Sequence, residues 1–317
     1  LDELDPELLR GLVKNVDAFA RVSPAHKLQI VQALQDAGDV VAMTGDGIND
    51  GPALKSANIG VAMGDSGTDL ARSVSDVVLE DDNLHTMVDA VRHGRTIYNN
   101  IRKTIHFLLS SNASEIEVML VGILIVNGQP LNPMRLVWIN LITDIFPGLA
   151  LSMEPPESDV LDRPPRDPGE PIIRRRDLAR MGVESGVITA STIGSFLYGL
   201  MRYGPGPQAG TMAFTALTVS QLLHAISCRS DTQSIYTAGD RPRNRQLDIA
   251  ILGSLLAQGA TLTIPGLRKL LGTAPLGIAD LVVALATSGL PLLINEATKR
   301  GGGMRDATNG DEAGERN

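Results

Sequence analysis

Two carboxylates, Asp46 and Asp50, stand four residues apart in the run TGDGINDGPAL, which covers residues 44–54. The apolar stretch just before it, residues 40–43, is typical of a buried strand in a parallel sheet. Glycines let the backbone turn sharply at the carboxyl end of that strand, the edge where ligands bind in open α/β sheets. Carboxylate oxygens suit a hard cation such as Mg²⁺. The run therefore predicts a Mg²⁺ site, and a surface turn rich in Asp and Gly is the alternative.

A second group of oxygen-bearing side chains lies inside apolar stretches. Asn112 and Glu115 are spaced i,i+3 within one stretch, and so share one helix face. Ionisable groups at membrane depth are costly and are rare unless they serve a function. Two carboxylates with amide and hydroxyl oxygens make a good cage for a dehydrated divalent cation. A structural hydrogen-bond cluster that joins two helices is the alternative.

The partners of this pair lie in the next apolar stretch. Asn140, Thr143 and Asp144 are spaced i, i+3, i+4 and share a face as well. Pro147 follows Thr143 by four residues, and it has no backbone N–H to donate. The spacing therefore predicts that the Thr143 carbonyl lacks its helical partner and is free to bind an ion.

The elements that must position these residues differ between the two halves of the chain. Short apolar strands over 40–43, 59–63 and 76–79 alternate with helices, one opening at Pro24 and a short one over 51–57. This alternation indicates an α/β doubly wound parallel sheet. From residue 83 the apolar period becomes helical, and no proline interrupts 83–126. One continuous helix from the soluble part into lipid is the prediction.

The second half predicts an all-α bundle of six transmembrane helices. About 20 apolar residues cross the hydrocarbon core, and the fourth and fifth stretches are the shortest. Arginine-rich segments at 163–180 and 229–245 orient the bundle, since such segments stay in the cytoplasm. We expect a soluble cytoplasmic part over 1–103, spans within 104–296 and a disordered polar tail over 297–317. The six stretches lie near residues 104–126, 133–153, 179–200, 211–228, 247–264 and 276–295.

Composition excludes some classes of protein. The net charge of −8 and the aromatic content of 3% argue against a nucleic-acid binder. The single cysteine, Cys228, excludes an internal disulfide and a cysteine cluster for metal, and a buried bystander thiol is the expected role. No secretory signal is visible, and the sequence starts at Leu1. We therefore expect a piece of a longer protein that lacks its front half.

The run at 44–54 resembles the hinge motif TGDGxNDxPAL of P-type cation-transporting ATPases, which are haloacid-dehalogenase-like phosphotransferases; only Gly51 is unusual. Residues 19–27, FARVSPAHK, resemble the FARxxPxxK element of that family. Residues 81–83 and 94–100 match the strand end and the helix that enters the membrane. The resemblance implies a haloacid-dehalogenase-like sheet. It also implies catalytic roles for Asp46 and Asp50 as Mg²⁺ ligands, Asn49 as a hydrogen-bonding neighbour and Lys27 as the charge that offsets the transferred phosphoryl group.

Residues 110–115, SSNASE, and 138–144, WINLITD, resemble the fifth and sixth membrane helices of sarco/endoplasmic-reticulum-type calcium pumps. The loop residues 154–156 and 162–166 resemble those that follow in these pumps. Gln221 stands where they place a ligand glutamate, which lowers the charge of the site and leaves a second bound ion open. Glu117, two residues from Glu115, is expected to face elsewhere. The implied cation ligands are Asn112, Glu115, Asn140, Thr143, Asp144 and Gln221.

The phosphorylated aspartate of this family lies in a DKTGT motif, which the 317 residues do not contain. The leading hypothesis is the C-terminal half of an ATP-driven, Mg²⁺-dependent Ca²⁺ pump in the plasma membrane, inactive without its N-terminal half. Its partners would be the lipid bilayer, the missing half and the transported cation. Mn²⁺, Na⁺ or H⁺ are alternative cargoes. A membrane-anchored phosphatase with the same sheet and a non-catalytic membrane subunit are the competing classes.

Overall fold

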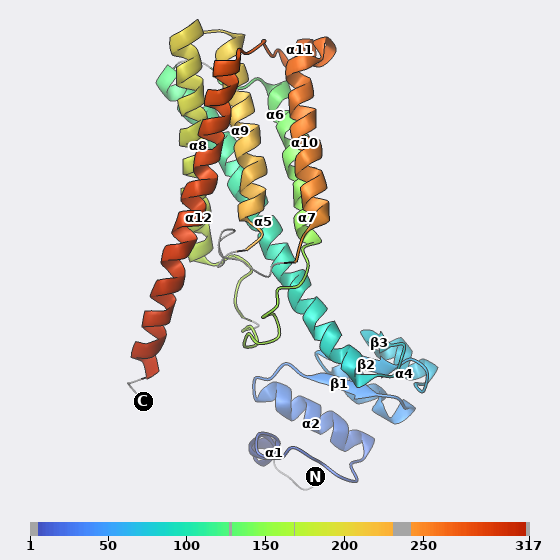
Figure 1. Cartoon of the computed structure of the whole chain (residues 1–317). Coiled ribbons are helices and arrows are strands. Elements are labelled where there is room, and N and C mark those ends of the chain that lie inside the picture. The colour runs from blue at the N-terminus through green and yellow to red at the C-terminus, as the bar shows by residue number, and fades with distance from the viewer. Residues whose placement is uncertain (1–5, 127–128, 168, 231–241, 315–317) are drawn as a thin grey trace. The chain divides into compact units, whose positions relative to one another are not determined.

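The computed structural model describes residues 6–126, 129–167, 169–230 and 242–314 (Figure 1). The chain divides into two compact units, Leu1–Arg92 and His93–Asn317. The boundary falls inside a helix, ten or so residues before the domain boundary that we placed after residue 103. Each unit is described by itself.

The first unit contains a three-stranded parallel sheet in the order β1-β2-β3, with strands Ala42–Gly45, Ile59–Met63 and Val77–Leu79. In register, Thr44 pairs with Val61, and Ala62 pairs with Val78. The parallel sheet is confirmed, and the strand predicted over 40–43 begins two residues later. The expectation that this strand is buried was wrong. Because β1 is an edge strand in the described sheet, its side chains are exposed or half-buried, and Val40 before it is 60% exposed.

Short helices connect the strands, and two of them, η1 and α3, form part of the run at residues 44–54. They are α1 (Pro6–Val13), α2 (Pro24–Asp36), the 3₁₀ turn η1 (Ile48–Asp50), α3 (Gly51–Ser56) and α4 (Asp69–Val74). Helix α2 opens at Pro24 as predicted, because the Ser23 hydroxyl accepts from the His26 N–H while His26 Nδ1 accepts from the Ser23 N–H. A small core of Leu54, Ala62 and Ala71 joins α3, β2 and α4.

Helix α5 (Leu84–Val126) is one uninterrupted helix of 43 residues, as the lack of a proline predicted. Its start is fixed by the preceding polar residues: Asn83 Oδ1 accepts from the His85 N–H at 2.9 Å, and Asp81 Oδ2 accepts from the Thr86 hydroxyl at 2.8 Å. That bond from Thr86 holds the pKa of the Asp81 carboxyl below its usual value. Anionic oxygens at this end also suit the helix dipole.

The rest of the second unit is a helical bundle (Figure 1). Helices α8, α9 and α12 pack side by side, and α10 packs on α7. Almost all of α9 is buried, so it forms the centre of the bundle. The elements are α6 (Pro133–Ile139), the π-helix η2 (Asn140–Ile145), α7 (Phe146–Ser152), α8 (Arg175–Tyr203), α9 (Pro207–Ser227), α10 (Arg245–Thr263), α11 (Pro265–Leu271) and α12 (Ile278–Gly314).

Large apolar side chains cover the outside of the bundle: Leu124, Ile249, Leu256 and Ile278 are between 68% and 84% exposed. In the described part of the chain, four helices are long and apolar enough to cross a membrane. They become five if α10 and α11, which meet at a bend of 89°, form one span. Helix α8, predicted as the third span, is not among them, because Arg180, Glu184 and many Ser, Thr and Gly residues lower its hydropathy. Six spans remain a prediction.

The last helix differs from the sequence expectation in length. Helix α12 runs to Gly314 and so covers most of the range 297–317, for which we expected a disordered tail. No proline follows Pro291, so no residue there lacks the backbone N–H that a helix needs.

Candidate functional site

The bundle brings all six predicted cation ligands together from three helical segments. Gln221, fully buried on α9, donates from Nε2 to Glu115 Oε1 of α5 at 3.2 Å. Asn140 of η2 lies beside the same carboxylate. With its amide oriented by the hydrogen-bond network, its nitrogen donates to both Glu115 oxygens, at 3.0 and 3.1 Å. Glu115 itself is only 7% exposed, so these amides satisfy a buried carboxylate.

The other carboxylate, Asp144 of η2, is half-buried and also receives an amide and a hydroxyl group. Asn112 of α5 donates from Nδ2 to Asp144 Oδ2 at 3.0 Å, and the buried Thr143 hydroxyl lies 3.3 Å from Asp144 Oδ1. Thr143 Oγ1 also donates to the Ile139 carbonyl at 3.0 Å. Segments α5 and η2 thus pair with each other twice, Asn112 with Asp144 and Glu115 with Asn140, and α9 adds Gln221 to the second pair.

The backbone of this region changes more than the sequence predicted. We expected a single unpaired carbonyl at Thr143. Instead, all of Asn140–Ile145 leaves the α-helical pattern and forms a π-helix, between α6 and α7. Pro147, in the first turn of α7, cannot donate the hydrogen bond that an α-helix would need here. Wide turns of this kind occur frequently at functional sites.

Two buried oxygens beside the cluster have no hydrogen-bond partner among the described residues: Gln221 Oε1 and Ser111 Oγ. An unpaired polar atom in a fully buried position is costly unless something else pairs with it. Ser111 was not among the predicted ligands, although it lies in the SSNASE run. Both atoms are oxygens, the ligand type that a hard cation takes.

Glu117 faces away from this cluster, as expected from its spacing. It accepts hydrogen bonds from Ser185 and Thr189 of α8, both at 2.8 Å. Glu117 therefore provides a carboxylate at the same depth of the same helix that does not take part in the cluster.

The residues predicted for Mg²⁺ lie at the carboxyl end of β1. Asp46 follows the strand directly and is exposed, while Asp50 is buried and pairs through Oδ1 with Lys27 Nζ at 2.5 Å. Asn49, between them, is exposed. A Cβ on Gly45 would lie 2.6 Å from Asp50 Cβ, so only glycine lets Asp50 pack against the strand end. The structure thus presents one open carboxylate and one that a lysine already neutralises.

Comparison with known proteins gives one family for most of the chain. The family model described as cation transporting ATPase, C-terminus, matches residues 128–301. A calcium-transporting ATPase of Bacillus subtilis is 41% identical over 298 residues, covering 93% of this chain and 33% of the relative. Calcium-transporting ATPase 1 of Schizosaccharomyces pombe is 38% identical over 299 residues, covering 94% and 33%. Calcium-transporting ATPase type 2C member 1 of Homo sapiens is 36% identical over 300 residues, covering 95% and 32%.

The chain therefore spans about a third of the length of the curated relatives that it matches. Together with the apolar helices, the comparisons make it an integral membrane protein.

Proposed function

The chain belongs to the P-type cation-transporting ATPases, and we propose that it carries the transport site and the Mg²⁺-binding part of the phosphoryl site of an ATP-driven Ca²⁺ pump. The observation that carries this proposal is the intramembrane cluster, in which a buried carboxylate, Glu115, and a half-buried one, Asp144, meet amide and hydroxyl groups from α5, η2 and α9. A phosphatase anchored in the membrane has no use for such carboxylates. The relatives described above, which are calcium-transporting ATPases, support Ca²⁺ as the cargo.

The cluster suits a cation that enters and leaves. Glu115 and Asp144 supply the negative charge, and in the structure amide N–H groups donate hydrogen bonds to them. An amide has an oxygen beside its nitrogen, so Asn112, Asn140 and Gln221 can turn that oxygen to a bound Ca²⁺ and give up the hydrogen bonds. Ca²⁺ takes six to eight oxygen ligands in flexible geometry. Together with the Thr143 hydroxyl, the two carboxylates and the three amides offer enough oxygens for one ion. Because Gln221 is neutral, Glu115 and Asp144 are the two negative charges among these six residues.

We propose a haloacid-dehalogenase-like role for the parallel sheet. The donor types fit Mg²⁺, since Asp46 offers an exposed carboxylate at the carboxyl end of β1. Asp46 and Asp50 would hold the ion, which neutralises charge on the phosphoryl group when it is bound. Lys27 forms an ion pair with Asp50 in the structure. We propose that it also offsets the negative charge of the transferred phosphoryl group, and that Asn49 adds a hydrogen-bonding side chain. No DKTGT motif occurs in the 317 residues, so we propose that they do not hydrolyse ATP alone.

The cargo can be tested directly. In sealed vesicles that hold a full-length pump containing this sequence, ATP should drive uptake of radioactive Ca²⁺, because the cluster offers hard oxygen ligands and two charges. Uptake should stop with Glu115→Gln. Accumulation of Mn²⁺ with no Ca²⁺ uptake, or a proton or Na⁺ gradient in its place, would contradict Ca²⁺ as the cargo.

The orientation gives a second test. Asp167, exposed in the arginine-rich segment between α7 and α8, should face the cytoplasm. In a Cys228→Ser background, a cysteine placed by Asp167→Cys should resist an impermeant thiol reagent in intact cells and react after the membrane is opened. Reaction in intact cells would show that the bundle is inverted.

A further inference from the structure

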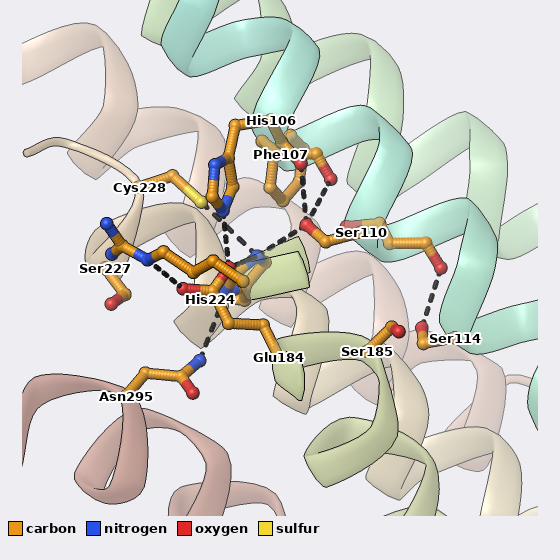
Figure 2. Close-up of polar contacts among 12 residues, drawn as sticks. His106, Phe107, Ser110, Ser114, Glu184, Ser185, His224, Ser227, Cys228 and Asn295 are labelled. Carbon is orange, nitrogen blue, oxygen red and sulfur yellow. Dashed lines mark hydrogen bonds and ion pairs between the residues drawn. The ribbon is translucent and has the colours of Figure 1, made fainter. Parts of the chain in front are cut away.

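A second cluster of ligand-type side chains lies at the end of α9, about one helical turn beyond Gln221 of the proposed cation site (Figure 2). His106 comes from α5, His224 from the last turn of α9, and Cys228 directly follows that helix. One ligand atom of each lies within 4.8 Å of the others. All three are buried, at 7%, 1% and 5% exposure. Because His224 and Cys228 are spaced i,i+4, they face the same side.

The separations fit one small metal ion. His224 Nε2 lies 3.3 Å from Cys228 Sγ. In a tetrahedral zinc site, the usual bond lengths put nitrogen and sulfur ligands about 3.3–3.6 Å apart. A fourth group is in reach: Glu184 Oε2 of α8 lies 3.8 Å from His224 Nε2 and also contacts His106 Nε2 (Figure 2). The other oxygen of Glu184 is held by Arg180 at 2.9 Å, which fixes the carboxylate in the cluster.

We propose that His106, His224, Cys228 and Glu184 bind a divalent transition-metal ion of the zinc class and so tie α5, α8 and α9 together. Two imidazoles, one thiolate and one carboxylate are ligands that Zn²⁺ accepts. Ca²⁺ takes oxygen ligands, so the proposed cargo is a poor fit here. On binding, the ion separates His106 Nε2 from Glu184 Oε2, which contact each other directly in the structure. The Cys228 thiol then releases its proton to solvent.

Surrounding groups support this assignment. The second nitrogen of His224, Nδ1, lies 3.5 Å from the side-chain amide of Asn295 on α12. That amide can turn its oxygen to accept Nδ1–H, the orienting contact that metal-bound histidines usually have. Ser110 favours the metal-free form instead: its Oγ donates to the His106 carbonyl and lies 2.7 Å from His224 Nε2, so it can only accept from an Nε2–H, which metal binding would have to replace by the Nδ1–H form of His224. The competing explanation is that these contacts form a metal-free polar network which joins the helices.

Cobalt separates the two explanations, because a thiolate bound to Co²⁺ gives a charge-transfer band in the near ultraviolet. Cys228 is the only cysteine, so such a band reports this residue alone. In the purified chain in detergent, Co²⁺ should give the band with one ion per chain, and Zn²⁺ should abolish it by displacement. Cys228→Ser should remove the band. His106→Gln and Glu184→Gln should weaken Co²⁺ binding by at least about 10-fold.

Controls keep a folding defect apart from a lost ligand. His93→Gln, on α5 but outside the cluster, should bind Co²⁺ like the original chain. Zn²⁺ should raise the Tm of the original chain and of His93→Gln, but not that of Cys228→Ser. No band and no change in Tm with the original chain would overturn the proposal in favour of a metal-free network. A band that persists in His106→Gln and His224→Gln would show adventitious binding to the thiol, and would overturn it too.

Discussion

Asp46→Asn should abolish phosphorylation in both directions in a full-length pump that contains this sequence. Asp46 is the open carboxylate at the carboxyl end of β1, while Asp50 is already paired with Lys27. In the function proposed above, phosphorylation from ATP and from inorganic phosphate would both need Mg²⁺ at this position. Losing the charge should reduce each by at least about 100-fold, the order expected when one electrostatic group is removed. Radioactive phosphoenzyme formed from labelled ATP, and separately from labelled phosphate, measures both.

Asp39→Asn is the matched control for that change. Asp39 is an exposed acid at the opposite, amino end of β1 and should leave both reactions intact. If Asp46→Asn still forms phosphoenzyme at the normal rate and with the normal Mg²⁺ dependence, the assignment of Asp46 is wrong.

Asp144→Asn and Glu115→Gln should affect only one of the two phosphorylation reactions. Each removes one charge from the intramembrane cluster and leaves the donor Asn112 or Gln221 facing a neutral group. Loss of one charged partner in a buried cluster costs about 3 kcal/mol, or roughly 100-fold in Ca²⁺ affinity. These variants should therefore lose Ca²⁺-activated phosphorylation from ATP. They should still accept inorganic phosphate, with Ca²⁺ no longer inhibiting, because the phosphoryl site is unchanged.

Glu117→Gln is the control for the intramembrane pair. It removes a carboxylate from the same helix at nearly the same depth, but Glu117 bonds to Ser185 and Thr189 outside the cluster. Ca²⁺ activation should survive this change. An Asp144→Asn variant that keeps Ca²⁺ activation would argue against the transport site. So would one that loses phosphorylation by inorganic phosphate as fully as Asp46→Asn.

The sequence predicted features that depend on local pattern. The parallel strands and the start of α2 followed from apolar runs and from the Ser23-Pro24 signal, and the 43-residue α5 followed from the absence of proline. The i,i+3 and i,i+4 spacings placed Glu115 and Asp144 on faces that meet in the structure. Periodicity is sufficient for these because a helix or strand fixes where neighbouring side chains point.

The remaining features depend on contacts between distant segments. Exposure of β1 follows from its edge position, which an apolar run does not reveal. The π-helix involves six residues, whereas Pro147 indicated only one altered carbonyl. Cys228 is buried, as expected, but its position near His106 could not be predicted, because His106 is more than a hundred residues earlier in the sequence. The unpaired Ser111 hydroxyl was not predicted, because its burial beside Gln221 depends on how α9 packs against α5.

Equilibrium binding of radioactive Ca²⁺ to the detergent-solubilised full-length pump, without ATP, tests the central claim most directly. It measures the intramembrane cluster with no contribution from the phosphoryl site. The account predicts saturable binding to the original pump and to Glu117→Gln, and binding weakened by roughly 100-fold in Glu115→Gln and Asp144→Asn. Equal Ca²⁺ affinity in all four proteins would show that these two carboxylates do not form the transport site.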